Sequence, residues 1–443
     1  MSVKKITAAR GGSAGPTELI EYSSCSQHAW RVRQACCVLA VVTLVSTAMP
    51  AAADEPQTPA AALTYSAALS RALSANPRIV AARLRRPINI ASRDVAAERL
   101  NPEVRVEASK ETPKQGYTLA VPLELGGKRT RRIAVADAAI KTGEAELNVA
   151  IAEVQADVRR AFIARVIAEN RLALLSDMQT LAQRARDAAQ ARFDAGGVPR
   201  LEVVQAQLAL ADAENQATAA RGTVDATRAT LNAVLAFPLD APTPIETSLD
   251  IEPALSVQTV VARARQSSAE LLALDRRIDE QRARVALAHA LRTPDVTPEA
   301  ALTRRAEPEF DTGWRAAIAV SIPVFTTHQA AVRVEDATLA QLTSEREAVA
   351  ARISGEVTAA AAVAESQRQQ FVRYRDEIVP QALELERMAD DAYRLGQTGI
   401  AAYLQAVQSS RDVRLRSIQS AADLQNAIAD LERAIGAPLT PAP

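Results

Sequence analysis

Residues able to bind a metal or to carry out acid–base chemistry are sparse in this sequence. Beyond the N-terminal region only His289 and His328 remain, and no Cys, His or Asp cluster has the spacing of metal ligands. We interpret both as surface or turn histidines. The segment GGKRT (126–130) does not match a phosphate-binding loop, because Pro122 stands where that motif needs its first glycine. The sequence therefore predicts no catalytic, cofactor or metal site, and a protein that is not an enzyme.

Residues 1–53 have the pattern of an N-terminal extension and signal peptide. Two arginines precede the apolar run 35–45, and small residues in an Ala-x-Ala register follow it. We predict cleavage between Ala53 and Asp54. A transmembrane anchor is the alternative, although the apolar run is short for one.

The three cysteines, Cys25, Cys36 and Cys37, all precede this cleavage point, so the mature chain is expected to lack disulfide bonds and thiol chemistry. No other stretch is long and apolar enough for a membrane helix. An exported protein without one is periplasmic, secreted or an outer-membrane barrel.

The composition favours closely packed helices. Aromatic residues make up only 3% of the 443 residues, and alanine, which has the best helix propensity, is abundant. The 52 basic residues balance the 52 acidic residues, so nothing indicates nucleic acid as a partner.

The chain contains one pattern twice. NPEV at 101–104 matches TPDV at 293–296, and ARFDAGGVPRLEVVQAQ at 191–207 matches DAYRLGQTGIAAYLQAVQ at 391–408. The order of the matches is the same and their offset stays nearly constant, which indicates an internal duplication. The repeats are predicted at 63–239 and 255–439, joined by a Pro-rich connector at 240–254.

Each repeat is expected to contain a first helix, two strands and a long helical hairpin. The first helices are predicted at 63–100 and 257–291, and each is expected to be continuous. The strands fall at about 102–125 and 294–324, and the hairpins at 130–235 and 329–435. A helix of about 65 residues would be roughly 100 Å long, which suits a rod better than a compact domain.

The strands alternate as membrane strands do. In GYTLAVPLEL (116–125) the apolar side chains share one face, and in GWRAAIAVSIPVF (313–325) they do so again. An ordinary soluble hairpin remains the alternative. Four strands cannot close a barrel, so strands that span a membrane must be pooled from several chains.

The sequence resembles the TolC-like outer-membrane efflux family over nearly the whole mature chain. The resemblance rests on the duplication, on the Tyr/Phe-x-x-Gly turns, and on the segments ALSANPRIVAAR (72–83), VPLELGGKRTRRIAVADA (121–138) and SIPVFTTHQAAVRVEDA (321–337). The form PLELGGKR looks most like the cobalt-zinc-cadmium branch, which serves heavy-metal efflux.

The resemblance implies a mainly α protein with a small membrane β part. Three chains would form a homotrimer, pooling four strands each into a twelve-stranded outer-membrane β-barrel in contact with lipid, continued by a periplasmic α-barrel duct. It implies docking with a periplasmic adaptor (membrane fusion) protein and an inner-membrane RND-type pump. The barrel-to-helix junction falls at Pro122, Gly126, Gly127 and Pro323, and the basic run 128–132 would lie at the membrane-proximal rim or, alternatively, in a ligand site.

The resemblance also places a periplasmic aperture and the adaptor contact at the hairpin tips. The candidate residues are Phe193, Gly196, Gly197, Glu202, Tyr393, Gly396, Gly399 and Gln405. Where the family often has acidic residues after the second turn, this chain has Ala402 and Gln405, so we expect any constriction to rely on packing and hydrogen bonds. The turn glycines could equally serve as plain helix C-caps.

Three functions compete. The first is a passive outer-membrane exit duct for heavy-metal cations, and the second is the same duct serving drug efflux or type I protein secretion. The third is a periplasmic coiled-coil scaffold without a pore. Fold alone does not identify the cargo.

Overall fold

The computed structural model describes residues 62–247, 264, 266–306 and 308–436. All described residues belong to one compact unit, Pro59–Pro443. The predicted signal peptide with its cleavage point at Ala53–Asp54 and the three cysteines lie outside the described residues. So does part of the predicted connector.

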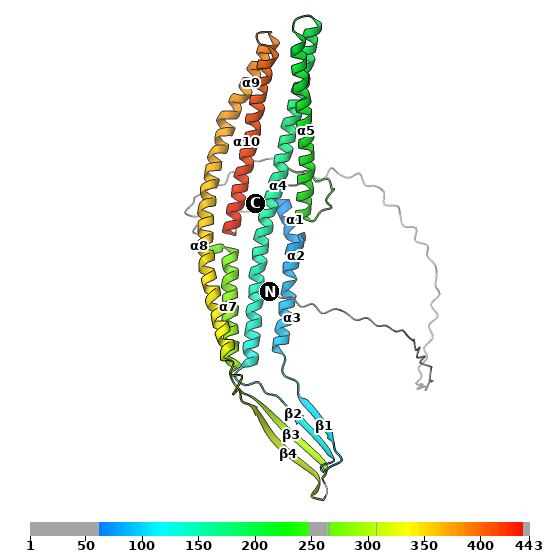
Figure 1. Ribbon diagram of the computed structural model, residues 1–443, viewed down its shortest axis with the longest axis vertical. Helices are drawn as coiled ribbons and strands as arrows, with labels where there is room; N and C mark the ends of the chain where they lie inside the picture. Colours follow the sequence, from blue (N-terminus) through cyan, green and yellow to red (C-terminus); the bar gives the residue numbers. More distant parts are fainter. Residues whose placement is uncertain (1–61, 248–263, 265, 307, 437–443) are drawn as a thin grey trace, which may run out of the picture. The chain divides into compact units, whose positions relative to one another are not determined.

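The described part of this unit consists of long helices and one small sheet. Figure 1 shows the helices side by side, with the four strands at one end and the turns of two helical hairpins at the other. This confirms the predicted fold class, which is mainly helical with long hairpins and four antiparallel strands.

The first helix of the first repeat is broken into three pieces, so the prediction of a continuous helix at 63–100 is wrong. The pieces are α1 (Tyr65–Ala75), α2 (Pro77–Arg83) and α3 (Arg85–Ala97). Asn76 causes the first break because it precedes a proline, which disfavours the helical conformation. Its backbone is extended, and its side-chain oxygen accepts a hydrogen bond of 2.9 Å from the Arg78 amide, which caps α2.

The first hairpin is formed by α4 (Lys128–Asp194) and α5 (Arg200–Leu235). Helix α4 runs for 67 residues without interruption. Val154, Val158 and Phe162 recur every four residues and are buried against α1 and α5 in the largest core cluster. This stripe holds the first hairpin to the N-terminal helices.

The second hairpin has a defect that the first lacks. Helix α7 (Ala269–Ala290) precedes the two strands of this repeat. They are followed by α8 (Gln329–Arg373), a π-helical turn η1 (Tyr374–Ile378), α9 (Val379–Arg394) and α10 (Ile400–Ile435). Pro380 lies just after the π-helical turn and has no amide hydrogen to donate four residues back. The π-helical turn absorbs this missing bond without ending the helix.

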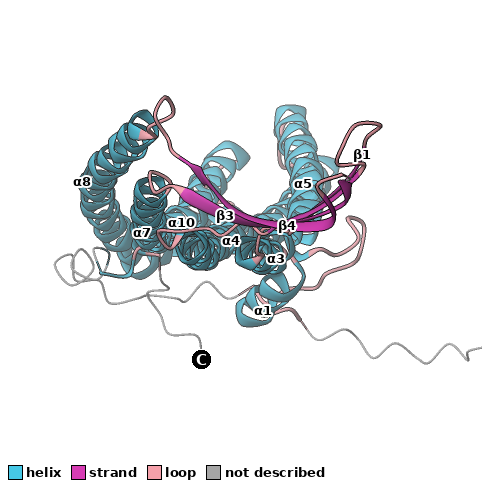
Figure 2. Cartoon of the chain, turned by 90° about the horizontal axis from the view of Figure 1, so that it is seen from below, coloured by secondary structure: helices cyan, strands magenta, loops and turns pink. Residues whose placement is uncertain are grey.

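Within the described residues, four strands form one antiparallel sheet in the order β1-β2-β3-β4. They are β1 (Glu103–Ala108), β2 (Gln115–Ala120), β3 (Asp295–Ala306) and β4 (Phe310–Ser321). Strands β2 and β3 pair with each other, so the two repeats share one sheet. Figure 2, seen from below, shows this sheet as a curved layer across the ends of the helices.

The sheet leaves its apolar side chains exposed. Trp314 is 83% exposed and Ile318 is 71% exposed, and both belong to the alternating face of β4 predicted from the sequence. Strands β1 and β4 each pair with only one neighbour within the described residues. Unpaired strand edges and an open apolar face need a further partner to cover them.

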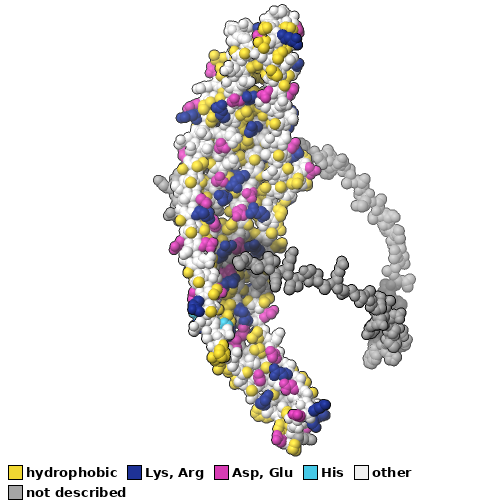
Figure 3. All heavy atoms as spheres, viewed as in Figure 1, with side chains coloured by type: hydrophobic (Ala, Val, Ile, Leu, Met, Phe, Trp, Pro, Cys, Tyr) yellow, Lys and Arg dark blue, Asp and Glu magenta, His cyan; other side chains and the backbone are white. Residues whose placement is uncertain are grey.

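Charged side chains of both signs are interspersed along the helices on the face shown in Figure 3. That face has no broad area of a single sign, in agreement with the even charge balance of the sequence. In the part of the chain that the structure describes, no helix is both long enough and apolar enough to cross a membrane.

Candidate functional site

The two hairpin turns are built alike. Gly196 and Gly396 both have a φ of +74°, in the left-handed region that glycine adopts without strain. The Gly197 amide donates to the Arg192 carbonyl at 2.8 Å, and the Gln397 amide donates to the Ala392 carbonyl at 2.9 Å. This six-to-one bond is the Schellman ending of a helix, so both turns are helix C-caps in their geometry.

A cluster of aromatic side chains lies beside these turns. Tyr393 at the end of α9 and Tyr403 at the start of α10 are stacked, with ring centroids 5.2 Å apart and an interplanar angle of 12°. The Arg192 guanidinium of α4 lies 5.1 Å from the Tyr393 ring centroid, which is a cation–π contact. The cluster therefore links the tips of the two hairpins.

Three polar atoms in this cluster are buried and make no hydrogen bond of good geometry. They are the Tyr393 hydroxyl, Nη1 of Arg192 and Oε2 of Glu202. An unpaired buried polar group costs about 1–3 kcal/mol, so such groups favour any partner that satisfies them. Burial also raises the pKa of Tyr393, which keeps its hydroxyl protonated as a donor, and the Arg192 guanidinium partly opposes this effect.

Tyr403 is held more firmly. Burial and the nearby carboxylates of Asp390 and Glu386 raise its pKa far above the ordinary tyrosine value. Glu386 in turn accepts a hydrogen bond of 2.5 Å from the Ser410 hydroxyl, which is itself fully buried. These contacts fasten α9 to α10 just behind the turn.

The structure brings some of the predicted tip residues together and leaves others apart. Glu202 and Gly399 approach each other, since a Cβ built on Gly399 would lie 3.8 Å from Oε1 of Glu202. Glu202 also lies close enough to raise the pKa of Tyr393. Phe193 is 37% exposed and Gln405 is exposed, and neither belongs to the cluster.

Sequence reasoning missed Arg192, Tyr403 and Asp390. Aromatic residues are rare in this chain, with 6 tyrosines and 6 phenylalanines. Because tyrosine is rare, the occurrence of Tyr393 and Tyr403 on either side of the same hairpin turn was a usable signal for Tyr403. Nothing in the sequence indicates Arg192, because its partner lies in the other repeat.

The junction between strands and helices is the second candidate region. Gly126 and Gly127 have φ values of +69° and +70°, and Gly127 is the N-cap of α4. A Cβ on Gly126 would lie 2.5 Å from Oγ1 of Thr293, whereas Gly127 has nothing within 4 Å. In the second repeat His328 takes the same position before α8 with a φ of 55°.

Ion pairs stabilise this junction, one of them between the two repeats. Nζ of Lys128 lies 2.7 Å from Oδ2 of Asp295, and the Lys128 side chain is only 7% exposed. Arg132 forms a bidentate pair with Glu124. In the described chain, two members of the basic run 128–132 are thus engaged in ion pairs within the protein.

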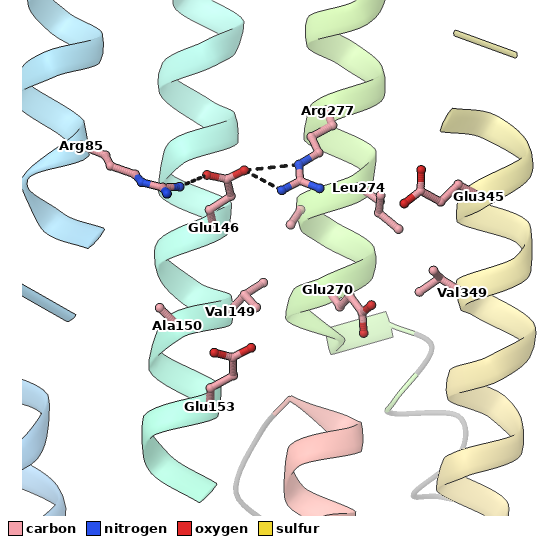
Figure 4. Close-up of a pocket in the computed structure, with 11 residues that line it drawn as sticks. Arg85, Glu146, Val149, Ala150, Glu153, Glu270, Leu274, Arg277, Glu345 and Val349 are labelled. Carbon is pink, nitrogen blue, oxygen red and sulfur yellow. Dashed lines mark hydrogen bonds and ion pairs between the residues drawn. The ribbon is translucent and has the colours of Figure 1, made fainter. Parts of the chain in front are cut away.

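A glutamate-lined cavity of about 300 Å³ lies between α4, α7 and α8. Figure 4 shows Glu146 bridging Arg85 and Arg277, at 2.6 and 2.7 Å. Glu270 and Glu153 are likewise paired, with Arg352 and Arg78. No group of three or more His, Cys, Asp or Glu side chains within the described ranges could hold a metal ion. In the described structure, Glu146, Glu153 and Glu270 of this cavity are therefore held in ion pairs with arginines.

Comparison with known proteins agrees with this architecture. Residues 68–236 match the family described as outer membrane efflux protein. The cobalt-zinc-cadmium resistance protein CzcC of Cupriavidus metallidurans is 25% identical over 279 residues, which cover 62% of this chain and 66% of CzcC. The nickel-cobalt-cadmium resistance protein NccC of Alcaligenes xylosoxydans xylosoxydans is 27% identical over 348 residues, which cover 73% of this chain and 75% of NccC.

Solved structures share the fold. The CmeC outer membrane channel of Campylobacter jejuni superimposes with a TM-score of 0.71 at 14% identity, over 84% of this chain and 85% of CmeC. The long hairpins, the four strands and the family match define a channel of the outer membrane that extends into the periplasm. The resemblance of the sequence to the TolC-like outer membrane efflux family agrees with the family match over residues 68–236 and with the fold of the solved channels. Proteins of this family are trimeric partners of efflux pumps and are channels, not enzymes.

Proposed function

We propose that this protein is the passive exit duct of a tripartite efflux system for heavy-metal cations of the cobalt, zinc and cadmium type. The assignment of metal cations as the cargo rests on the similarity to CzcC and NccC, whose names both record metal resistance. A duct needs only weak binding of its cargo, since conduction requires release. The lack of a metal-binding cluster among the described residues is compatible with such a role.

Closure of the duct requires more than one chain. The described residues of one copy supply four strands with two free edges, and four strands cannot close on themselves. Three copies would supply twelve strands in one closed sheet and would cover both edges. The outer helices support this arrangement, because Leu208 on α5 and Met388 on α9 are 67% and 59% exposed.

The hairpin turns are the part of the chain available to the other components. In the proposed complex they contact a periplasmic adaptor protein, which connects the duct to an inner-membrane RND-type pump. The same tips would form the periplasmic aperture. Its closure would depend on the stacked tyrosines and on the unpaired polar atoms of Arg192, Glu202 and Tyr393.

The test is the growth of a deletion strain on cobalt, zinc, cadmium, nickel, copper and silver salts, beside a panel of dyes and antibiotics. A complemented strain is the control. Sensitivity confined to metals supports the proposed cargo. Sensitivity to organic compounds alone contradicts it and favours a duct for drugs or for secreted protein. A mature protein that is soluble and forms no heat-modifiable trimer would instead favour the pore-free scaffold.

A further inference from the structure

The strand pairing places most charged side chains of the sheet on one of its faces. Residues paired across neighbouring strands point to the same side, and successive residues of a strand alternate between sides. Trp314 pairs with Leu302, and Leu302 pairs with Tyr117, so these three residues mark the apolar face. Arg304 also pairs on that face, beside the strand turns. The opposite face of the described strands carries Glu103, Arg105, Glu107, Asp295, Glu299 and Arg315.

Two arginines of this charged face lie in one row across the sheet. Arg105 of β1 pairs with Thr118 of β2. Thr118 pairs with Ala301 of β3, and Ala301 pairs with Arg315 of β4. Both arginines are exposed, and neither forms an ion pair with another described residue. The side chains between them are small, so both guanidinium groups remain accessible to ions in solution.

Carboxylates occupy the rows on either side of the arginines. Glu103 pairs with Ala120, and Ala120 pairs with Glu299, in a row two residues nearer the helices. Glu107 lies in the row two residues nearer the strand turns. Rows two residues apart are separated by about 6.6 Å, which is shorter than the Debye length of about 8 Å at physiological ionic strength. An ion near one row is therefore also affected by the charge of the next row.

This charged face would line the lumen in the arrangement proposed above. The apolar face of a membrane strand contacts lipid, and the opposite face contacts water. Because strands in a barrel tilt by about 35–45°, each row would run obliquely, and three copies would form interrupted bands of charge. Charged side chains that line a pore decide which ions enter it. The strand lumen would therefore carry a negative, a positive and a second negative band in succession.

The arginine row changes what such a lumen can conduct. A lumen of carboxylates alone would admit cations and exclude anions. A cation that left without an anion would leave uncompensated charge behind, and the resulting potential would oppose the exit of the next cation. Guanidinium groups remove this restriction, because they bind small anions through charge-assisted hydrogen bonds.

We propose that Arg105 and Arg315 form an anion-binding row in the lumen of the strand barrel, where small inorganic anions such as chloride or phosphate accompany the exported cations. The inference rests on the proposed barrel of three copies and goes beyond it, because it assigns ion selectivity to two residues of the strands. Neutralisation of the arginines by neighbouring carboxylates is the competing arrangement. In the described structure, however, Arg315 and its diagonal neighbour Glu299 form no ion pair.

Thiol reactivity in intact cells measures the charge of this row. Thr118→Cys places a thiol between the two arginines, and the mature chain is expected to contain no other cysteine. The probes are an anionic and a cationic methanethiosulfonate of similar size, added outside the cells, with rates normalised to those of a free thiol. We expect the anionic probe to react at Thr118→Cys about tenfold faster, because a site lined by one sign of charge concentrates counter-ions. Equal rates, or a faster cationic probe, would overturn the proposal.

Two neighbouring positions test the row and the face separately. Ala120→Cys, in the row of Glu103 and Glu299, should react faster with the cationic probe. Leu119→Cys, between these rows on the apolar face, should react slowly with both probes. Fast reaction of Leu119→Cys together with an unreactive Thr118→Cys would reject the proposed barrel itself. A reactive Thr118→Cys without a charge preference would reject the anion-binding row alone.

Charge variants identify the source of the preference at Thr118→Cys. The double variant Arg105→Gln/Arg315→Gln should abolish it, whereas Arg105→Lys/Arg315→Lys should retain most of it. Arg304→Gln, on the apolar face, should leave it unchanged. A preference that survives Arg105→Gln/Arg315→Gln would overturn the assignment. Folding of each variant is checked by its recovery as an assembled protein in the outer membrane.

Ion passage is measured with the full-length protein in planar lipid bilayers under a KCl gradient. The Tyr393→Ala background is used, so that the hairpin tips do not determine the selectivity. Arg105→Gln/Arg315→Gln should lower the permeability to chloride relative to potassium severalfold, and an unchanged ratio would contradict anion passage. The cargo is tested separately by growth on metal salts. Metal sensitivity of the deletion strain that this protein fails to complement would reject the cargo, whatever the thiol rates.

Discussion

Nζ of Lys128 lies 2.7 Å from Oδ2 of Asp295, although the two residues belong to different repeats. Lys128 begins α4, and Asp295 begins β3. Oδ1 of the same aspartate accepts a hydrogen bond from the Leu125 amide at 3.2 Å. One carboxylate thus joins the first long helix of one repeat to the sheet of the other at the point where strands give way to helices.

Breaking this pair should destabilise the junction. In Asp295→Asn the Lys128 ammonium stays buried without a counter-charge, and we expect a loss of roughly 2–3 kcal/mol in the free energy of unfolding. Thermal unfolding followed by circular dichroism measures it. Glu144→Gln is the control, since its pair with Arg86 is exposed and should contribute about 0–1 kcal/mol. Equal losses in both variants would show that burial of the lysine has no special effect.

The two junction glycines should respond differently to alanine. Both have positive φ, so each substitution costs about 1 kcal/mol in backbone strain. Gly126→Ala also places a Cβ within 2.5 Å of Oγ1 of Thr293, whereas Gly127→Ala meets nothing. The unfolding temperature should therefore fall further in Gly126→Ala. The double variant Gly126→Ala/Thr293→Gly should recover the difference, and no recovery would locate the clash elsewhere.

The cluster of Tyr393, Tyr403 and Arg192 at the hairpin turns should control leakage through the proposed aperture. Tyr393→Ala removes a 96% buried side chain (4% exposed), which costs roughly 3–5 kcal/mol where it packs. We expect the conductance in planar lipid bilayers to rise by about tenfold or more, because 1.4 kcal/mol already shifts an equilibrium tenfold. Glu202→Gln should raise it less. Tyr374→Ala, on the same hairpin but outside the tip, is the control. Unchanged conductance in both tip variants would contradict the aperture.

Alkaline pH should loosen the same tip. The pKa of Tyr403 is raised in the folded protein by burial and by the carboxylates of Asp390 and Glu386. Its contribution to stability is therefore complete below the unfolded pKa of about 10 and is lost as the pH rises beyond it, where only the unfolded chain releases the proton. Tyr403→Phe should flatten the stability profile above pH 10, and Tyr374→Phe should not. A profile unchanged by Tyr403→Phe would assign the alkaline loss to other groups.

Much of the fold could be predicted from periodicity. The spacing of Val154, Val158 and Phe162 predicts the buried face of α4, and the alternation around Trp314 predicts an exposed apolar strand face. Local exceptions were harder to predict. The break at Asn76 depends on a competition between helix propensity and a single Asn-Pro pair. His328 has a positive φ although it is not a glycine, so the residue type gives no signal of this conformation.

The candidate site could be predicted only in part. The turn glycines follow from local sequence, because a helix C-cap needs a positive φ at one known position. The contact between Arg192 and Tyr393 joins positions about 200 residues apart. Such contacts depend on how the two hairpins lie beside each other, and no periodic pattern in one segment carries that information.

The π-helical turn gives the two hairpins of each chain unequal mechanical properties. Helix α4 is a single bonded rod of 67 residues, whereas its counterpart is split into α8, a five-residue π-helical turn and the 16 residues of α9. In a ring of three copies, stiffer and more compliant hairpins would therefore alternate around the duct. Strain applied at the tips would concentrate at three points at the same height, and the wall of the duct would yield there first.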